Sequence, residues 1–168
     1  MPLMTNKTDT ASVWDLLESV CDPEIPVLTV TDLGIVRDIV LHPDGLLEVV
    51  ITPTYSGCPA MNTIAINIKA ALQEAGFDAV KVTTVLSPAW TTDWMSEAGR
   101  DKLRAYGIAP PAPGTVDKKA LFQDDVMVPC PNCGAEDTRM VSQFGSTACK
   151  AMYKCNECLE PFDYFKCH

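Results

Sequence analysis

The sequence predicts an α+β protein in which helices cover a small mixed β-sheet, with a small zinc-ribbon module at the C-terminus. Helical and strand-like hydrophobic patterns alternate over residues 10–106. Residues 109–114 read Ala-Pro-Pro-Ala-Pro-Gly, a composition that favours an extended linker. Six of the eight cysteines lie beyond that segment. We therefore expect a first domain over residues 1–109, a linker over 110–114 and a ribbon domain over 115–168.

The first domain is expected to begin with a helix over residues 10–20, where apolar side chains recur every three or four positions. Residues 21–26 contain two prolines and end this helix. Two β-rich runs follow, over residues 35–41 and 46–52, and the turn sequence His-Pro-Asp-Gly at 42–45 joins them. This pattern predicts a β-hairpin.

The longest expected helix spans residues 59–75, because its apolar residues form one stripe and Gly76 follows as a stop signal. A third strand is expected over residues 79–86. A shorter helix is expected over residues 94–106, with Asp93 as its N-cap. The order helix, hairpin, helix, strand, helix predicts a mixed sheet with helical cover.

The charge balance limits the classes of partner. The chain carries 22 acidic and 13 basic residues, which give a formal net charge of −9 at pH 7. Attraction to phosphates supplies most non-specific affinity for nucleic acids, so this charge argues against a nucleic-acid partner. No apolar run reaches the length of about 18 residues that suggests a membrane span, and the first nine residues lack the apolar region of a signal peptide. We expect a cytoplasmic protein whose cysteines stay reduced.

Two Cys-x-x-Cys turns mark the C-terminal module as a metal site. Cys130 and Cys133 form the first turn, and Cys155 and Cys158 form the second. Each turn can aim two thiolates at one ion, and two such turns complete a tetrahedron around zinc. We expect structural zinc here, and its binding would supply folding energy to a module with few aliphatic residues.

Other interpretations of these cysteines stay open. The turns are also compatible with disulfides, free core thiols, a redox Cys-x-x-Cys, iron or an iron–sulfur cluster. Cys149 and Cys167 lie close by in sequence and are alternative ligands. The acidic residues of the module favour a protein partner over a nucleic acid.

A lone cysteine, Cys58, lies between the second predicted strand and the longest predicted helix. The free N–H groups and the dipole of a helix start stabilise a thiolate, so we expect a lowered pKa at Cys58. Such a thiol can act as a nucleophile or as a ligand for a soft metal, and the alternative is an inert buried cysteine. Asp22, Glu24 and Asp32 are its candidate neighbours. Capping and turn formation are the alternative explanation of these three acids, and their spacing favours it.

The N-terminal part resembles the SufT-like family of iron–sulfur assembly factors through three motifs: Asp22-Pro-Glu-Ile-Pro-Val, Asp32-Leu-Gly-Ile-Val-Arg and Thr52-Pro-Thr-Tyr-Ser-Gly-Cys-Pro. The C-terminal part is similar to the D-subunit family of bacterial phenylacetyl-CoA epoxidases through Phe144-Gly-Ser-Thr-Ala-Cys-Lys and Glu160-Pro-Phe-Asp-Tyr-Phe-Lys-Cys. The resemblance covers residues 10–168 and identifies Cys58 as the motif cysteine of the family.

This resemblance implies an accessory protein that assists maturation of the epoxidase and does not itself catalyse the epoxidase reaction. The implied partners are the di-iron oxygenase subunit and/or the reductase subunit, which holds an iron–sulfur cluster and a flavin. The implied cargo is iron or an iron–sulfur cluster, handled transiently at Cys58. Two alternatives stay open: a thiol-dependent enzyme subunit with Cys58 as nucleophile, and a pure docking module. The sequence also leaves a homodimer open.

Overall fold

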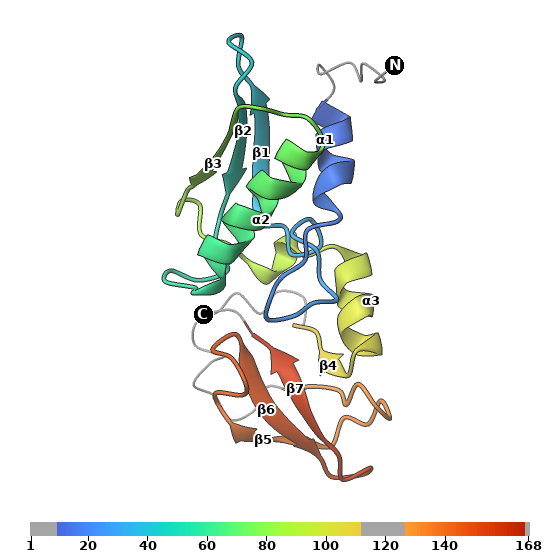
Figure 1. The fold of residues 1–168 in the computed structure, drawn as a ribbon. Coiled ribbons are helices and arrows are strands. Elements are labelled where there is room, and N and C mark those ends of the chain that lie inside the picture. Colours follow the sequence, from blue (N-terminus) through green and yellow to red (C-terminus); the bar gives the residue numbers. More distant parts are fainter. Residues whose placement is uncertain (1–9, 112–126, 167–168) are drawn as a thin grey trace. The chain divides into compact units, whose positions relative to one another are not determined.

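The computed structural model describes residues 10–111 and 127–166 and divides the chain into two compact units. The first unit is Met1–Trp90 and the second is Thr91–His168. Each unit has its own sheet, and the two units are described separately below (Figure 1).

The first unit is a three-stranded sheet with two helices. Its elements are α1 (Thr10–Leu17), β1 (Val36–Leu41), β2 (Leu47–Ile51), α2 (Ala60–Glu74) and β3 (Val80–Thr84). The strand order is β1-β2-β3, with β1 and β2 antiparallel and β2 and β3 parallel. The fold is therefore α+β with a mixed sheet, as the sequence predicts.

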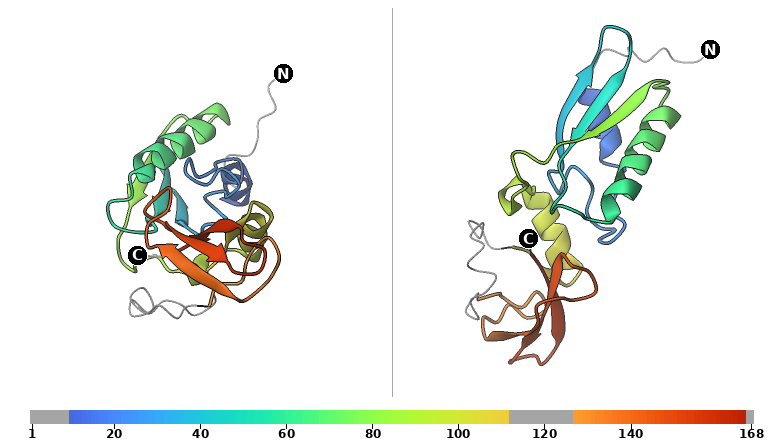
Figure 2. Two further views of the ribbon diagram at one scale, coloured as in Figure 1. Left: turned by 90° about the horizontal axis from the view of Figure 1, so that it is seen from below. Right: turned by 90° about the vertical axis from the view of Figure 1, so that its left-hand side faces the viewer.

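The helices cover one face of this sheet because strands and helices present matching apolar surfaces. In β2, Leu47, Val49 and Ile51 alternate with half-buried residues, so one face of the strand is buried. The buried side chains of α2 lie on one stripe, as expected for an amphipathic helix: Ala60, Ile64, Ile68 and Leu72. In Figure 1, α2 crosses in front of the strands, beside α1, and the right-hand view of Figure 2 shows the sheet and α2 from the side.

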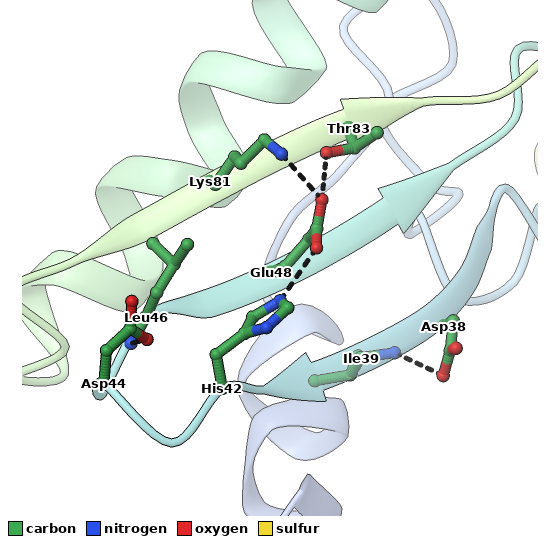
Figure 3. Close-up of polar contacts among 8 residues, drawn as sticks. All are labelled: Asp38, Ile39, His42, Asp44, Leu46, Glu48, Lys81 and Thr83. Atoms are coloured by element: carbon green, nitrogen blue, oxygen red, sulfur yellow. Dashed lines mark hydrogen bonds and ion pairs between the residues drawn. The ribbon is translucent and has the colours of Figure 1, made fainter.

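On the other face of the sheet, the Glu48 side chain connects β2 to β3 and to His42, the residue that follows β1. Its carboxylate accepts hydrogen bonds from Thr83 Oγ1 at 2.5 Å and from Lys81 Nζ at 3.1 Å, and it lies 2.9 Å from His42 Nε2. Figure 3 shows these side chains gathered over β2. Their hydrogen bonds, with that of Thr83 the largest, hold the pKa of Glu48 at about 2.

The predicted elements of this unit are confirmed, with shifted ends. Both hairpin strands, the helix after Cys58 and the third strand lie within one to two residues of their expected bounds. The first helix ends at Leu17 rather than at residue 20, because the backbone tightens into i→i−3 bonds such as Val20 N–H to Leu17 C=O at 3.1 Å.

Over residues 91–111 and 127–166, the second unit contains a short 3₁₀ turn, one helix and a four-stranded sheet. Its elements are η1 (Thr92–Trp94), α3 (Glu97–Ala105), β4 (Ile108–Ala109), β5 (Thr138–Ser142), β6 (Lys150–Cys155) and β7 (Pro161–Phe165). The strand order is β4-β7-β6-β5, with β4 parallel to β7 and the other pairs antiparallel.

The predicted cap of the third helix is wrong. Ser96, not Asp93, is the N-cap of α3, and its hydroxyl accepts a hydrogen bond from Gly99 N–H at 2.9 Å. Asp93 lies instead in η1, where its N–H donates to Thr91 Oγ1 at 3.1 Å. Of the predicted helix, only Trp94 lies in this 3₁₀ turn, and α3 begins three residues later, at Glu97.

The division between the two compact units lies at Trp90 and Thr91. Residues 91–111 are joined to the rest of the second unit by the pairing of strand β4 with β7. Within this segment, the buried guanidinium of Arg100 donates to the carbonyl oxygens of Pro111 at 2.6 Å and Thr92 at 2.7 Å. Most of the predicted linker, residues 112–114, lies outside the described residues.

The second unit, Thr91–His168, is called the ribbon unit below, and it has an aromatic core of its own. Tyr153 stacks on Phe162 with ring centroids 5.9 Å apart, and it meets Tyr164 edge-on at 5.5 Å. Cys130 and Cys155 are buried in the same cluster. The shortage of aliphatic residues is therefore partly offset by aromatic packing. In the part of the chain that the structure describes, no helix is long and apolar enough to cross a bilayer.

Candidate metal and thiol sites

Four cysteines of the ribbon unit converge on one point. The sulfurs of Cys130, Cys133, Cys155 and Cys158 all lie within 4.8 Å of one another. Two of the S–S distances are 3.7 Å (Cys130 to Cys158) and 3.6 Å (Cys133 to Cys155). A tetrahedron with Zn–S bonds of about 2.3 Å has S–S edges of about 3.8 Å. The four sulfurs therefore fit a single zinc ion.

The two knuckles that carry these sulfurs have the same backbone design. In the first, Cys130 N–H donates to Ala135 C=O at 2.9 Å, and in the second, Cys155 N–H donates to Glu160 C=O at 3.0 Å. The residue after the second cysteine takes a positive φ in both knuckles, 78° at Gly134 and 65° at Leu159. Glycine adopts this conformation freely, whereas leucine does so at a cost.

Backbone N–H groups prepare the sulfurs to bind as thiolates. The N–H of Cys158 lies 3.4 Å from Cys155 Sγ. Together with the N–H of Glu157, it lowers the pKa of Cys155 to about 7. The N–H groups of Ala135 and Glu160 donate to Cys133 and Cys158 and lower the pKa of these thiols, but burial and the neighbouring cysteines outweigh them and raise both pKa values. A positive ion in this site would bind sulfurs that already accept hydrogen bonds from backbone N–H groups.

The geometry separates the ligand hypotheses. An iron–sulfur cluster places inorganic sulfide between its irons and holds its thiolates farther apart than one tetrahedral ion does. The 3.6–3.7 Å spacing therefore favours one mononuclear ion. Cys149 lies outside this four-sulfur group, and its Sγ contacts Thr147 Oγ1 at 3.0 Å. Cys167 lies outside the described residues.

Cys58 occupies a separate site in the first unit, at the end of a tight turn. Cys58 N–H donates to Tyr55 C=O at 3.2 Å, and Gly57 between them has a φ of 85°. The N-cap of α2 is Pro59, which has no side-chain cap hydrogen bond. Cys58 therefore lies one residue before the N-cap and two residues before the start of α2, and it is half-buried.

The predicted lowering of the Cys58 pKa is wrong. Burial raises the pKa of this thiol, and the hydrogen bonds from Ala60 N–H and the Tyr55 side chain offset the rise only in part. The charges of Glu24 and Asp22 raise the pKa further. A helix start does favour a thiolate, but at this site desolvation and two carboxylates outweigh it.

The structure brings two of the three predicted acids into electrostatic range of Cys58. Asp22 and Glu24 act on its pKa, and Asp22 Oδ1 also accepts hydrogen bonds from Glu24 N–H at 2.6 Å and Ile25 N–H at 3.0 Å. Asp32 is buried in a different turn, where Oδ2 accepts from Thr29 N–H at 3.2 Å. Asp32 thus forms a turn in the way that the alternative interpretation predicts.

Sequence reasoning missed Tyr55, whose side chain donates to Cys58. The available signal was the spacing: Tyr55 and Cys58 are the first and last residues of a four-residue turn with glycine at its third position.

Two family models match separate parts of the chain, and each part contains one of the two cysteine sites. Residues 10–86 match the family described as iron-sulfur cluster assembly protein, and residues 114–166 match the family described as PaaD zinc beta ribbon domain. The fold and the two cysteine sites thus define an iron–sulfur assembly domain joined to a zinc β-ribbon.

Individual relatives cover one or both parts. A protein of Escherichia coli K12, named as a D subunit of 1,2-phenylacetyl-CoA epoxidase, is 50% identical over 155 residues, 92% of this chain and 91% of the relative. The chain belongs to the family of phenylacetyl-CoA epoxidase D subunits. An Fe-S protein maturation auxiliary factor of Bacillus subtilis 168 is 39% identical over 88 residues, 51% of this chain and 83% of the factor. The solved structure of a conserved hypothetical protein of Thermotoga maritima has a TM-score of 0.51 and 31% identity, covering 60% of this chain and 98% of its own.

Proposed function

We propose that this protein is an accessory factor that assists maturation of the iron–sulfur or di-iron centre of a phenylacetyl-CoA epoxidase, with iron or a cluster as its cargo. The observation that carries the proposal is the Cys58 site: a half-buried thiol with the charges of Asp22 and Glu24 close enough to raise its pKa. Relatives named as Fe-S protein maturation auxiliary factors support the same role.

The charge around Cys58 favours a positive cargo. Negative groups beside a thiol oppose the loss of its proton, and a bound cation reverses that effect by replacing the proton. A soft sulfur with nearby carboxylates suits iron. Among the described residues, the closely spaced ligand group is the ribbon cluster, and Cys58 does not belong to it. A site with few ligands of its own suits transfer of a metal better than permanent storage.

The same features make covalent catalysis by Cys58 the weaker alternative. A nucleophilic thiol needs a lowered pKa or a positioned base. Burial and two carboxylates raise the pKa here. The histidine among the described residues, His42, is bound to Glu48 on the sheet. We therefore propose a non-catalytic role.

The ribbon would hold zinc as a structural ion and present a surface to the client. Zinc binding of ~10–16 kcal/mol in small modules is available as folding energy. The acidic surface and the closed four-thiolate site suit a protein partner, and we propose the oxygenase and/or the reductase subunit of the epoxidase. The site of action would be the cytoplasm, where reduced thiols persist.

The experiment is a strain in which Cys58→Ser replaces the wild-type protein, with Cys21→Ser as the matched control. Cys21 is a second thiol of the same unit and is exposed. We expect normal amounts of the epoxidase subunits in both strains and a lower iron content only in the Cys58→Ser strain. Normal iron content and activity in that strain would reject metal handling and leave the docking module.

A further inference from the structure

One row of residues across the sheet of the ribbon unit places two positive charges side by side. Arg139 of β5 lies directly opposite Lys154 of β6, and Lys154 lies directly opposite Pro161 of β7. Residues that lie opposite each other in a sheet project from the same face, and neighbours along a strand project from opposite faces. Met140 packs against the aromatic core. The row that contains Arg139 therefore lies on the outer face of the sheet.

This pair has no acidic partner among the described residues. Acidic residues lie close to the row in sequence: Glu136, Asp137, Glu157 and Glu160. Neither Arg139 nor Lys154 forms an ion pair with them or with any other described residue. Asp137 instead accepts a hydrogen bond from Asn156 Nδ2 at 2.8 Å. Like charges directly opposite each other destabilise a strand pair, so this row lowers the stability of the ribbon unit.

A second destabilising feature lies at the same end of the sheet. Leu159, in the turn between β6 and β7, has a φ of 65°. A leucine adopts this backbone conformation at a cost, and burial does not offset it, because the side chain is 64% exposed. Met152, two positions before Lys154 on the outer face, is a further exposed apolar side chain. Strain and unpaired like charges in a folded protein are typical of functional surfaces.

We propose that Arg139, Met152, Lys154 and Leu159 form a docking face, through which the ribbon unit binds an acidic segment of its client protein that also carries an apolar side chain. An acidic segment would neutralise two charges that repel each other, and the apolar side chain would cover Leu159 and Met152. The net charge of −9 makes a nucleic acid or a second copy of the chain a poorer occupant, because the rest of the chain would repel both. The inference rests on the proposed function for the identity of the client, and not on iron handling at Cys58.

The test is binding of the zinc-loaded full-length chain to the purified oxygenase and reductase subunits of the epoxidase, measured at several salt concentrations. The variants are Arg139→Glu and Leu159→Gly. The control is Lys69→Glu, which reverses one exposed charge on α2 of the first unit. We expect each variant to weaken binding to at least one subunit by about tenfold, and the control to bind like wild type. Added salt should weaken binding of wild type more steeply than binding of Arg139→Glu.

The stability of the two variants separates a lost contact from a folding defect. Arg139→Glu replaces the repelling pair with opposite charges, and Leu159→Gly removes the cost of the positive φ. Release of zinc during urea unfolding should therefore need at least as much urea in both variants as in wild type. Weaker binding by a ribbon that is equally or more stable supports a docking role.

Four results would overturn the proposal. They are wild-type affinity in both variants, no binding of wild type to either subunit, zinc release at lower urea in Arg139→Glu, and self-association or binding of a DNA duplex that Arg139→Glu abolishes. The last result would assign the face to a second copy or to a nucleic acid. Binding should be unchanged in Cys58→Ser, so normal client iron in that strain would reject metal handling and leave the docking face standing.

Discussion

The residue that follows the second cysteine differs between the two knuckles, and that difference predicts opposite effects of two substitutions. Gly134 and Leu159 follow the second cysteine of their knuckles with φ of 78° and 65°. A side chain in this region costs roughly 1–2 kcal/mol. Exchanging glycine for a larger residue also recovers about 0.4–1 kcal/mol by restricting the unfolded chain. Gly134→Ala should therefore destabilise the zinc-bound ribbon by about 1 kcal/mol, and Leu159→Gly should stabilise it by about 1 kcal/mol.

Steric clashes and lost burial contribute little to either change. A Cβ at Gly134 would meet no atom within 4 Å. Leu159 is 64% exposed, so its removal takes little apolar surface from the core. The magnitudes therefore depend on backbone conformation alone.

The assay is release of zinc to a coloured chelator during urea unfolding, which reports on the ribbon unit specifically. Gly45→Ala is the matched control, because Gly45 has a φ of 87° with open space around it and lies in the hairpin turn of the first unit. We expect the midpoint of zinc release to fall for Gly134→Ala, to rise for Leu159→Gly and to stay unchanged for the control. Shifts of the same sign in the two ribbon variants would refute the reasoning.

Three further outcomes are expected. Cys130→Ala should reduce the tightly bound metal from one ion per chain to none and unfold the ribbon, since three thiolates leave the tetrahedron open. Elemental analysis with circular dichroism checks this. A metal-free ribbon that stays folded would contradict the prediction. Glu48 has a pKa lowered from 4.5 to about 2 in the folded chain, so its stabilising effect is complete above pH 4.5 and is lost as the pH falls toward 2. The free energies of unfolding in urea of wild type and Glu48→Gln should therefore converge over that pH range. A constant difference between them would exclude the ionised carboxylate as the source of the stabilisation. Cys58→Ser should change the free energy of unfolding by only about 1 kcal/mol, because a hydroxyl can keep one ordinary hydrogen bond. The wild-type thiol, in turn, should be alkylated more slowly at pH 7 than free cysteine, because its pKa is raised. Faster alkylation would restore the nucleophile hypothesis.

Local patterns predicted the fold of the first unit well because each element has a complete local signal. The helix after Cys58 has an uninterrupted apolar stripe and a glycine stop, and the hairpin has a turn sequence between two β-rich runs. The four-cysteine cluster was predictable for the same reason, since each knuckle is specified within a few residues.

Features that depend on distant partners could not be predicted in this way. Strand β4 has only two residues, and it forms because β7, more than fifty positions later, offers it a partner. This pairing places Ile108 and Ala109 in the sheet of the second unit. The raised pKa of Cys58 likewise depends on burial and on the Asp22–Glu24 loop, whereas the sequence shows only the nearby helix start.

The central claim is that Cys58 handles iron at a site separate from the ribbon ion. Anaerobic metal analysis tests this claim most directly. Zinc-loaded wild-type, Cys58→Ser and Cys21→Ser proteins are incubated with ferrous ion or with a reconstituted cluster. They are then desalted, and their zinc and iron contents are measured. We predict one zinc per chain in all three, with iron retained by wild type and Cys21→Ser and lost from Cys58→Ser. Equal iron in the three proteins, or displacement of the ribbon zinc by iron, would contradict the account.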